Sequence, residues 1–200
     1  MDQLWSPWRF RYVSQVNENT PCIFCAKAAG DSAQDREQLI LHRGRANLLL
    51  LNLFPYTTGH AMIAPYAHLA NLDELEPATL TEMFLLAQRF QRALRDCYHP
   101  DGYNLGMNLG KSAGAGIEAH LHLHILPRWF GDANFMTVVG ETRVLPEDLL
   151  TTYDKLVRGF PRESWAALDP SAKCMGCRKR TGSLLGFLRV LLSFRDGLDR

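Results

Sequence analysis

Three histidines, His120, His122 and His124, alternate with leucines in the segment HLHLHIL. Successive side chains of a β-strand point to opposite faces, so a strand here would place all three imidazoles on one face. At a rise of ~3.3 Å per residue the outer two lie ~13 Å apart, which is too far for one metal ion to bind all three. Solvated polar histidines are one alternative. A site with two or three metal ions is another, but the segment lacks the Asp and Glu ligands that such sites usually need.

A glycine-rich segment, NLGKSAGAG at residues 108–116, lies just before the histidines. Glycines allow backbone N–H groups to approach an anion closely, although such a loop alone is more often a flexible turn. It is not a Walker loop, because no helix follows the Gly-Lys-Ser sequence as that motif requires. Together with the imidazoles, the loop favours a neutral histidine that attacks phosphorus and forms a phosphoramidate, which divides one difficult displacement into two easier ones.

These segments resemble the two motifs of the histidine triad (HIT) family of nucleotidyl hydrolases and transferases. HLHLHIL is similar to the family's His-φ-His-φ-His-φ-φ signature, and residues 52–68 are similar to its other motif, N-x-x-P-x-x-x-G-H-x-x-I-x-P-x-x-H. The motifs occur in the family's order, and the resemblance covers roughly residues 22–135. Three further segments, LWSPWR, CIFC and the stretch from PRW to GETR, resemble bacterial diadenosine tetraphosphate phosphorylases within the family.

The resemblance implies a role for each matching residue. His122 is the nucleophile, and a backbone carbonyl that accepts from its Nδ1–H would leave Nε2 to attack. His124 contacts the phosphates and assists the departing group, His60 supports His124, and Asn52 binds the ribose hydroxyls. The glycine-rich loop is expected to stabilise the nonbridging phosphate oxygens electrostatically. Its candidate residues are Asn108, Ser112, Gly114, Ala115 and Gly116.

Two positions leave alternatives open. Many relatives carry Ser or Thr five residues before the nucleophile, where this chain has Ile117, so backbone groups or Ser112 are expected to substitute. Trp129 is a candidate for stacking on a second nucleobase, because an aromatic face stacks on any base. A core tryptophan is an equally good interpretation of that residue.

The first of two Cys-x-x-Cys pairs, Cys22 and Cys25, indicates little on its own. The resemblance extends to bacterial relatives that bind zinc, and it implies a Zn²⁺ site made of this pair with His68 and His120. Two thiolates and two imidazoles suit a closed, structural tetrahedral site, and reduced buried thiols are the alternative. The second pair, at residues 174–177, is expected to be free thiols, with zinc or redox chemistry as the alternative.

Composition bounds the class of protein. The 200 residues are 46% apolar and 22% charged, which is enough for one core, and the net charge of +1 gives no support to nucleic-acid binding. Five cysteines are an odd number for a disulfide framework. The sequence shows no secretory signal and no run of about 18 apolar residues, so we expect a cytoplasmic protein without a membrane span.

Hydrophobic patterning predicts the elements that carry these motifs. Apolar runs at 39–41, 46–51 and 61–64 predict a strand meander, and spacings of three and four predict a long helix over 77–98. Strands are expected at 103–109 and 121–126, the latter ended by Pro127, and a shorter helix at 146–158. Strands on both sides of one large helix favour an α+β fold with an antiparallel sheet of about five strands. The resemblance implies the HIT fold, with the sheet continued across a homodimer or within a larger homo-oligomer.

Three regions are expected along the chain: an N-terminal arm at 1–20, a HIT domain at 21–160, and a basic tail at 161–200. The tail holds eight basic and four acidic residues, a net of +4, and no role is assigned to it. The implied function is cleavage of dinucleoside polyphosphates. Diadenosine tetraphosphate (Ap4A) is the first candidate substrate, either free or as its Mg²⁺ complex. An adenylyl-histidine would pass its nucleotide to inorganic phosphate or to water. A nucleoside phosphoramidase and a nucleotide-binding sensor without turnover are the alternatives.

Overall fold

The computed structural model describes residues 21–133 and 145–160. The predicted N-terminal arm at 1–20 and basic tail at 161–200 lie outside the described residues, as does the second cysteine pair. None of the helices in the two described ranges is long and apolar enough to cross a lipid bilayer.

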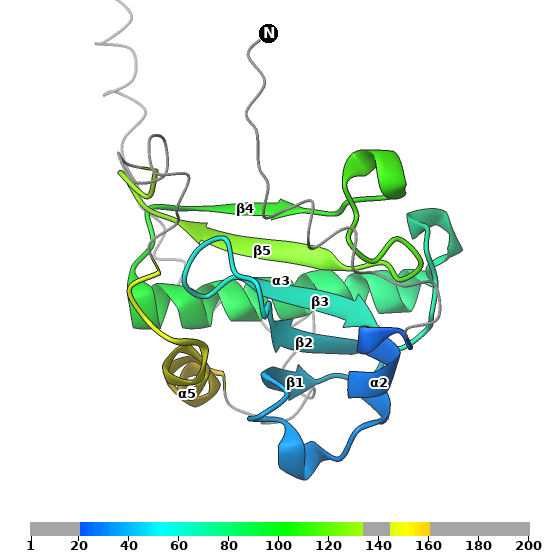
Figure 1. The fold of residues 1–200 in the computed structure, drawn as a ribbon, viewed down its shortest axis with the longest axis horizontal. Helices are drawn as coiled ribbons and strands as arrows, with labels where there is room; N and C mark the ends of the chain where they lie inside the picture. The colour runs from blue at the N-terminus through cyan, green and yellow to red at the C-terminus, as the bar shows by residue number, and fades with distance from the viewer. Residues whose placement is uncertain (1–20, 134–144, 161–200) are drawn as a thin grey trace, which may run out of the picture. The chain divides into compact units, whose positions relative to one another are not determined.

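Five antiparallel strands form one sheet in the order β1-β2-β3-β5-β4 (Figure 1). The first three form the predicted meander: β1 (Ile40–Arg43), β2 (Asn47–Leu51) and β3 (Ala61–Pro65). The last two cross over, so that β5 (Leu123–Arg128) pairs with β3 and leaves β4 (Gly102–Gly106) at the edge. The predicted α+β fold with an antiparallel sheet of about five strands is confirmed.

The long helix α3 (Pro77–Tyr98) packs on one face of the sheet and has the predicted bounds. Proline opens the helix, where its missing N–H costs nothing, and His99 ends it in a left-handed conformation. The apolar stripe that faces the sheet is buried, and it contains Met83, Leu86, Ala87, Phe90 and Leu94. Burial of this stripe supplies the core on one face of the sheet.

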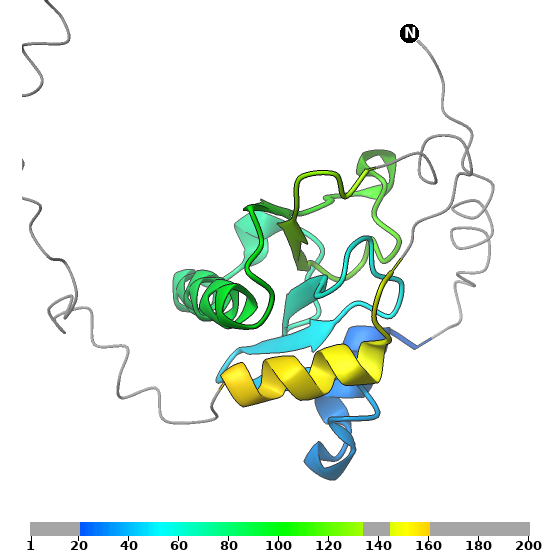
Figure 2. The same cartoon turned by 90° about the vertical axis from the view of Figure 1, so that its left-hand side faces the viewer.

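The shorter helix α5 (Leu149–Gly159) packs against α3 and β1 (Figure 2). Its predicted start at residue 146 is wrong by three residues. The side chain of Asp148 accepts a hydrogen bond from the Thr151 backbone N–H and so caps the helix one residue before Leu149. Glu147 lies outside the helix and instead accepts a hydrogen bond from the Tyr98 hydroxyl at the end of α3.

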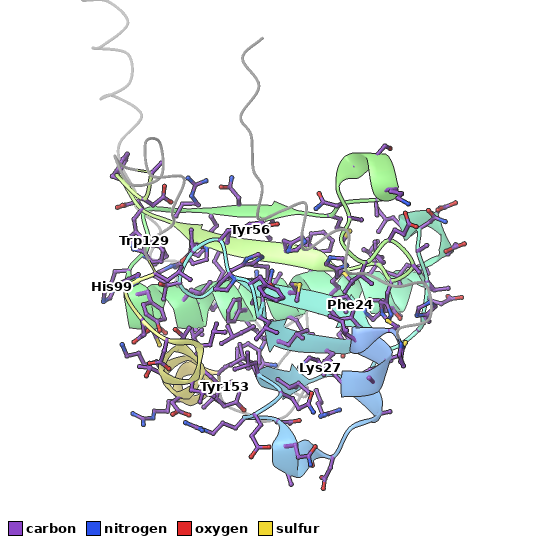
Figure 3. The ribbon with its side chains drawn as sticks, viewed as in Figure 1. Phe24, Lys27, Tyr56, His99, Trp129 and Tyr153 are labelled. Carbon is purple, nitrogen blue, oxygen red and sulfur yellow. The ribbon has the colours of Figure 1, made fainter. Side chains whose placement is uncertain are left out.

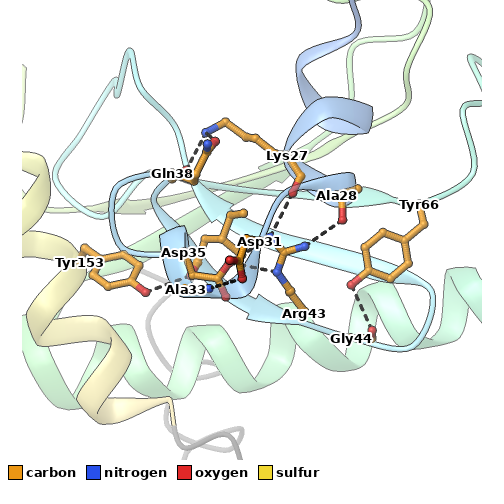
Figure 4. Close-up of polar contacts among 11 residues, drawn as sticks. Lys27, Ala28, Asp31, Ala33, Asp35, Gln38, Arg43, Gly44, Tyr66 and Tyr153 are labelled. Atoms are coloured by element: carbon orange, nitrogen blue, oxygen red, sulfur yellow. Dashed lines mark hydrogen bonds and ion pairs between the residues drawn. The ribbon is translucent and has the colours of Figure 1, made fainter.

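The other face of the sheet carries a short helix, α2 (Ile23–Ala29), which the sequence patterning did not predict. Phe24 of this helix is 1% exposed and packs in an apolar cluster with Ile40, Leu48, Leu50, Met62 and Ala64. Seven residues are too few for a helix to be stable alone, so α2 depends on its anchors. Arg43 of β1 donates to the carbonyls of Lys27 and Ala28 at the helix end and pairs with Asp35 (Figure 4).

Two strand predictions need correction. β4 ends at Gly106 rather than 109, and β5 begins at Leu123 and continues through Pro127 rather than ending there. The pairing of β5 with β3 ends at Ile125, so residues 126–128 extend beyond it. Pro127, which has no N–H, is tolerated in this part of the strand. Of the three alternating histidines, only His124 therefore lies within the strand, because His120 and His122 precede it.

Candidate active site and metal centre

The backbone fixes the proton position on His122, which is 5% exposed. Its Nδ1 lies 2.8 Å from the carbonyl oxygen of His120. A carbonyl only accepts hydrogen bonds, so Nδ1 carries the proton and Nε2 keeps its lone pair. Burial lowers the pKa of His122, which keeps the ring neutral near pH 7. His122 thus presents an unprotonated nitrogen, as a nucleophile requires.

A chain of hydrogen bonds places the proton of His124 on Nε2, whereas the proton of His122 is on Nδ1. His60 Nδ1 accepts from the Tyr56 backbone N–H at 3.1 Å, so the proton of the neutral His60 ring is on Nε2. That N–H donates to His124 Nδ1 at 2.9 Å, which places the proton of His124 on its own Nε2. Burial lowers the pKa of His124 to about 4. The site therefore pairs a nitrogen lone pair on His122 with an N–H donor on His124.

Ring contacts connect these histidines in a row. The centroids of His122 and His124 lie 4.8 Å apart with nearly perpendicular planes, and His60 lies 5.1 Å from His124 on its other side. Phe24 lies 5.1 Å from His120 and 5.0 Å from His122. The three motif histidines therefore share one side of the sheet, as the alternation predicts, although the strand begins only at Leu123.

Tyr56 is a site residue that the sequence reasoning missed (Figure 3). Its ring centroid lies 4.8 Å from His60 and 6.5 Å from His124, to which it is nearly parallel. Asn52 lies close by: its Nδ2 is 3.4 Å from His60 Nδ1, and its Oδ1 accepts from the Phe54 backbone N–H at 3.0 Å. The only signal for Tyr56 in the sequence is its place four residues before His60.

The glycine-rich loop adopts the backbone conformations that glycine permits. Gly110 and Gly114 have φ values of 78° and 84°, which favour glycine over residues with a Cβ. They flank a 3-10 turn at Lys111–Ala113 that exposes Ser112. Ile117, which stands where relatives carry Ser or Thr, packs against the apolar cluster around Phe24. Asn108 and residues 114–116 are half-buried, and their contacts with phosphate stay a prediction.

Trp129 lies five residues beyond His124, about 16 Å along the strand at the usual rise. Its ring is half-buried, and its Nε1–H donates to the carbonyl of Tyr98 at the end of α3. Figure 3 shows it beside His99, at the opposite end of the view from Phe24. A role in base stacking stays a prediction.

The four predicted metal ligands come together where α2 meets the segments around His68 and His120. Cys22 Sγ and His68 Nδ1 each lie 3.2 Å from His120 Nδ1, and Cys25 Sγ lies 3.2 Å from His68 Nδ1. A tetrahedral Zn²⁺ with ordinary bond lengths separates two nitrogens by about 3.3 Å and nitrogen from sulfur by about 3.6 Å. His120 Nε2 donates to the Pro65 carbonyl at 2.8 Å, which directs the Nδ1 lone pair at the cluster. The donor set and its spacing therefore fit zinc.

The antiparallel α+β fold carries hydrogen-bonded histidines on one side of its sheet, and sequence comparison identifies the family of proteins to which the chain belongs. The HIT domain family matches residues 33–131. An "AP-4-A phosphorylase" of Mycobacterium tuberculosis is 34% identical over 168 residues, which cover 82% of this chain and 86% of that protein. This chain belongs to the HIT family.

Other relatives agree with this assignment. A bis(5'-adenosyl)-triphosphatase of Dictyostelium discoideum is 30% identical over 93 residues, covering 46% of this chain and 62% of that protein. The crystal structure of a zinc-bound histidine triad family protein from Mycobacterium smegmatis is 31% identical, with a TM-score of 0.56 over 70% of this chain and 92% of that one. A hypothetical histidine triad nucleotide-binding protein from Sulfolobus tokodaii has a TM-score of 0.54 at 26% identity, over 70% of this chain and 91% of that one.

The partial burial of His124 predicts how stability depends on pH. Its pKa is lowered from 6.5 to about 4, so between these values the unfolded chain binds a proton that the folded chain does not. The contribution to stability is complete above pH 6.5 and is lost as the pH falls toward 4, by up to about 3 kcal/mol in the free energy of unfolding. Urea unfolding at a series of pH values measures this loss.

The matched control is His124→Gln, in which this part of the pH dependence should be absent. NMR spectroscopy gives a direct check, because the ring signals of His124 should not titrate near pH 6.5. A midpoint near 6.5 for this ring would contradict the lowered pKa of His124.

Proposed function

We propose that this protein is a dinucleoside polyphosphate phosphorylase that converts Ap4A and inorganic phosphate to ADP and ATP. The observation that carries the proposal is the pair of proton positions, a lone pair on His122 Nε2 beside an N–H on His124 Nε2. The similarity to the M. tuberculosis AP-4-A phosphorylase extends over most of both chains and supports the choice of substrate.

In the first step, His122 Nε2 attacks an α-phosphorus of Ap4A. An N–P bond forms, the bond from that phosphorus to its bridging oxygen breaks, and ATP leaves with the electron pair. The His122 ring becomes cationic, and its Nδ1–H stays directed at the His120 carbonyl oxygen, which stabilises the charge. The Nε2–H of His124 donates a hydrogen bond to the departing oxygen, where negative charge develops.

In the second step, an oxygen of inorganic phosphate attacks the adenylyl phosphorus and the N–P bond breaks, so that ADP forms and His122 regains its lone pair. Asn52 binds a ribose hydroxyl, and Trp129 stacks on the second base. The nonbridging oxygens are bound by Asn108, Ser112, Gly114, Ala115 and Gly116. Water in place of phosphate gives a hydrolase, and the similarity to the D. discoideum triphosphatase supports this second candidate.

We also propose that Cys22, Cys25, His68 and His120 bind one Zn²⁺ ion. The spacing of their ligand atoms supports this assignment, and the M. smegmatis structural relative is a zinc-bound protein. Four protein ligands leave no open coordination position, so the ion would supply structural stability rather than a site for substrate. His122 and His124 then remain available for chemistry.

A homodimer is proposed at the edge of the sheet. β4 is an edge strand, and an unpaired edge is a template for another strand. Leu105 of β4 is 48% exposed and Phe84 of α3 is 51% exposed, although large apolar side chains are usually buried. Pairing of β4 with its counterpart in a second copy would continue the sheet and cover Leu105.

Product analysis tests the proposed reaction. With Ap4A and phosphate, we expect equal amounts of ADP and ATP, measured by ion-exchange chromatography, and little turnover without phosphate. AMP and ATP in the absence of phosphate would instead identify a hydrolase. The His122→Ala variant should lose at least about a thousandfold in kcat, because its covalent route is closed. Undiminished turnover in that variant would rule out the mechanism.

Metal analysis tests the zinc site. Purified protein should contain about one zinc per chain, since four protein ligands close one tetrahedral site. Cys22→Ser should remove most of this zinc and lower the melting temperature, whereas Cys97→Ser, which changes a cysteine outside the cluster, should keep both near wild type. Zinc near zero in the wild-type protein would contradict the assignment.

A further inference from the structure

Phe24 lies in the first turn of α2, between the proposed metal ligands Cys22 and Cys25 in the sequence, and its ring contacts that of the proposed nucleophile. It occupies the CIFC segment, with Cys22 and Cys25 on either side. Its ring lies 5.1 Å from the metal-cluster residue His120 and 5.0 Å from His122. At 1% exposure it is buried in the apolar cluster, so its position is set by packing rather than by solvent.

The position of Phe24 depends on how α2 is held. At the end of the helix, Arg43 donates to the carbonyls of Lys27 and Ala28, and Lys27 Nζ donates to the Gln38 carbonyl at 2.6 Å. At its beginning, the anchors are the Cys22 and Cys25 thiols in the metal cluster. A helix of seven residues has too few internal hydrogen bonds to hold itself, so the cluster governs where the first turn lies.

The His122 ring needs a lateral support that its own hydrogen bond does not supply. The bond from Nδ1–H to the His120 carbonyl limits rotation of the ring about Cβ–Cγ, but a hydrogen bond tolerates about 30° of misalignment, so it does not fix the ring plane alone. Two other rings contact the His122 ring. They are the His124 ring, whose plane is 72° from that of His122, and the Phe24 ring. Nucleophilic attack requires the Nε2 lone pair to align with the phosphorus and the departing oxygen, so rotation of the ring costs rate.

We infer that Phe24 is a positioning residue that connects the metal-bound first turn of α2 to the His122 ring. The metal centre reaches the nucleophile by two contacts, the backbone of His120 and the side chain of Phe24. The second contact gives Phe24 a role in holding the nucleophile in place, although Phe24 is not itself a catalytic residue. This inference rests on the proposed function and on the proposed zinc site.

The test compares Phe24→Leu with Ile23→Ala. Leucine keeps an apolar side chain in the cluster but removes the ring, and Ile23 is a neighbour in the same helix that is 41% exposed. Phe24→Leu should keep the zinc content and the KM for Ap4A near wild type while kcat falls about ten- to hundredfold. Ile23→Ala should stay within about twofold of wild type in all three. Phe24→Met serves as a second variant if leucine lowers the yield of folded protein.

A second readout does not depend on activity. The Nδ1–H proton of His122 should give a slowly exchanging NMR signal in the wild-type protein, because it is buried in a hydrogen bond. Its exchange should be at least about tenfold faster in Phe24→Leu, and at least as fast in wild-type protein stripped of zinc by a chelator, because zinc removal also loosens His120. Zinc removal from Phe24→Leu should add less than it does in the wild type, since the Phe24 contact is already lost and only the path through the His120 backbone remains.

The inference is overturned if Phe24→Leu matches the wild type in kcat and in Nδ1–H exchange, or if kcat falls only in proportion to zinc content. A failure of the proposed function is distinguishable from this result. In that case the wild-type enzyme itself does not convert Ap4A, while the exchange measurement still reports whether Phe24 holds the His122 ring.

Discussion

The hydrogen bond from His122 Nδ1–H to the carbonyl oxygen of His120 is the interaction on which the site depends. It fixes the tautomer and leaves the Nε2 lone pair for phosphorus. The same residue, His120, directs its ring Nδ1 toward three other potential metal ligands, while its Nε2–H is held by the Pro65 carbonyl. His120, whose carbonyl accepts the hydrogen bond from His122, is therefore also held in place through its own side chain. A hydrogen bond from the other ring nitrogen to a carbonyl fixes both the tautomer and the orientation of a metal-ligating histidine.

The sheet supplies the second constraint, which is burial. His124 lies opposite Met62 in the register of β5 with β3, and this places it beside His60, which directly precedes β3. Removal from water lowers the pKa values of His122 and His124 and keeps these two rings neutral, so that the direction of each hydrogen bond decides which nitrogen carries no proton. The low dielectric also strengthens each interaction with a developing phosphate charge. The fold thus specifies a lone pair on one ring and a donor on its neighbour without a permanent charge on either.

Much of this could be predicted from the sequence, because the decisive patterns are local. Apolar spacing gave the bounds of α3, and alternation gave the common side of His120, His122 and His124, although two of them precede the strand. Helix α2 could not be predicted, since seven residues show no reliable periodicity and its stability comes from distant anchors such as Arg43. Tyr56 was missed because the loop between β2 and β3 brings it to His60 and His124 only in the folded chain. The four metal ligands are dispersed over 99 residues, so only the family resemblance connected them before the structure did.

The central claim is that His122 forms a covalent bond to the nucleotide, and trapping that intermediate tests it most directly. The protein is mixed with Ap4A in the absence of phosphate, quenched in alkali, in which phosphoramidates survive, and digested for mass spectrometry. We expect one adenylyl group on the peptide that contains residues 120–124, localised to His122 by fragmentation and lost when phosphate is added before the quench, with release of ADP. Turnover of Ap4A with no adenylyl group on His122 at any time, or with the group on another residue, would contradict the account.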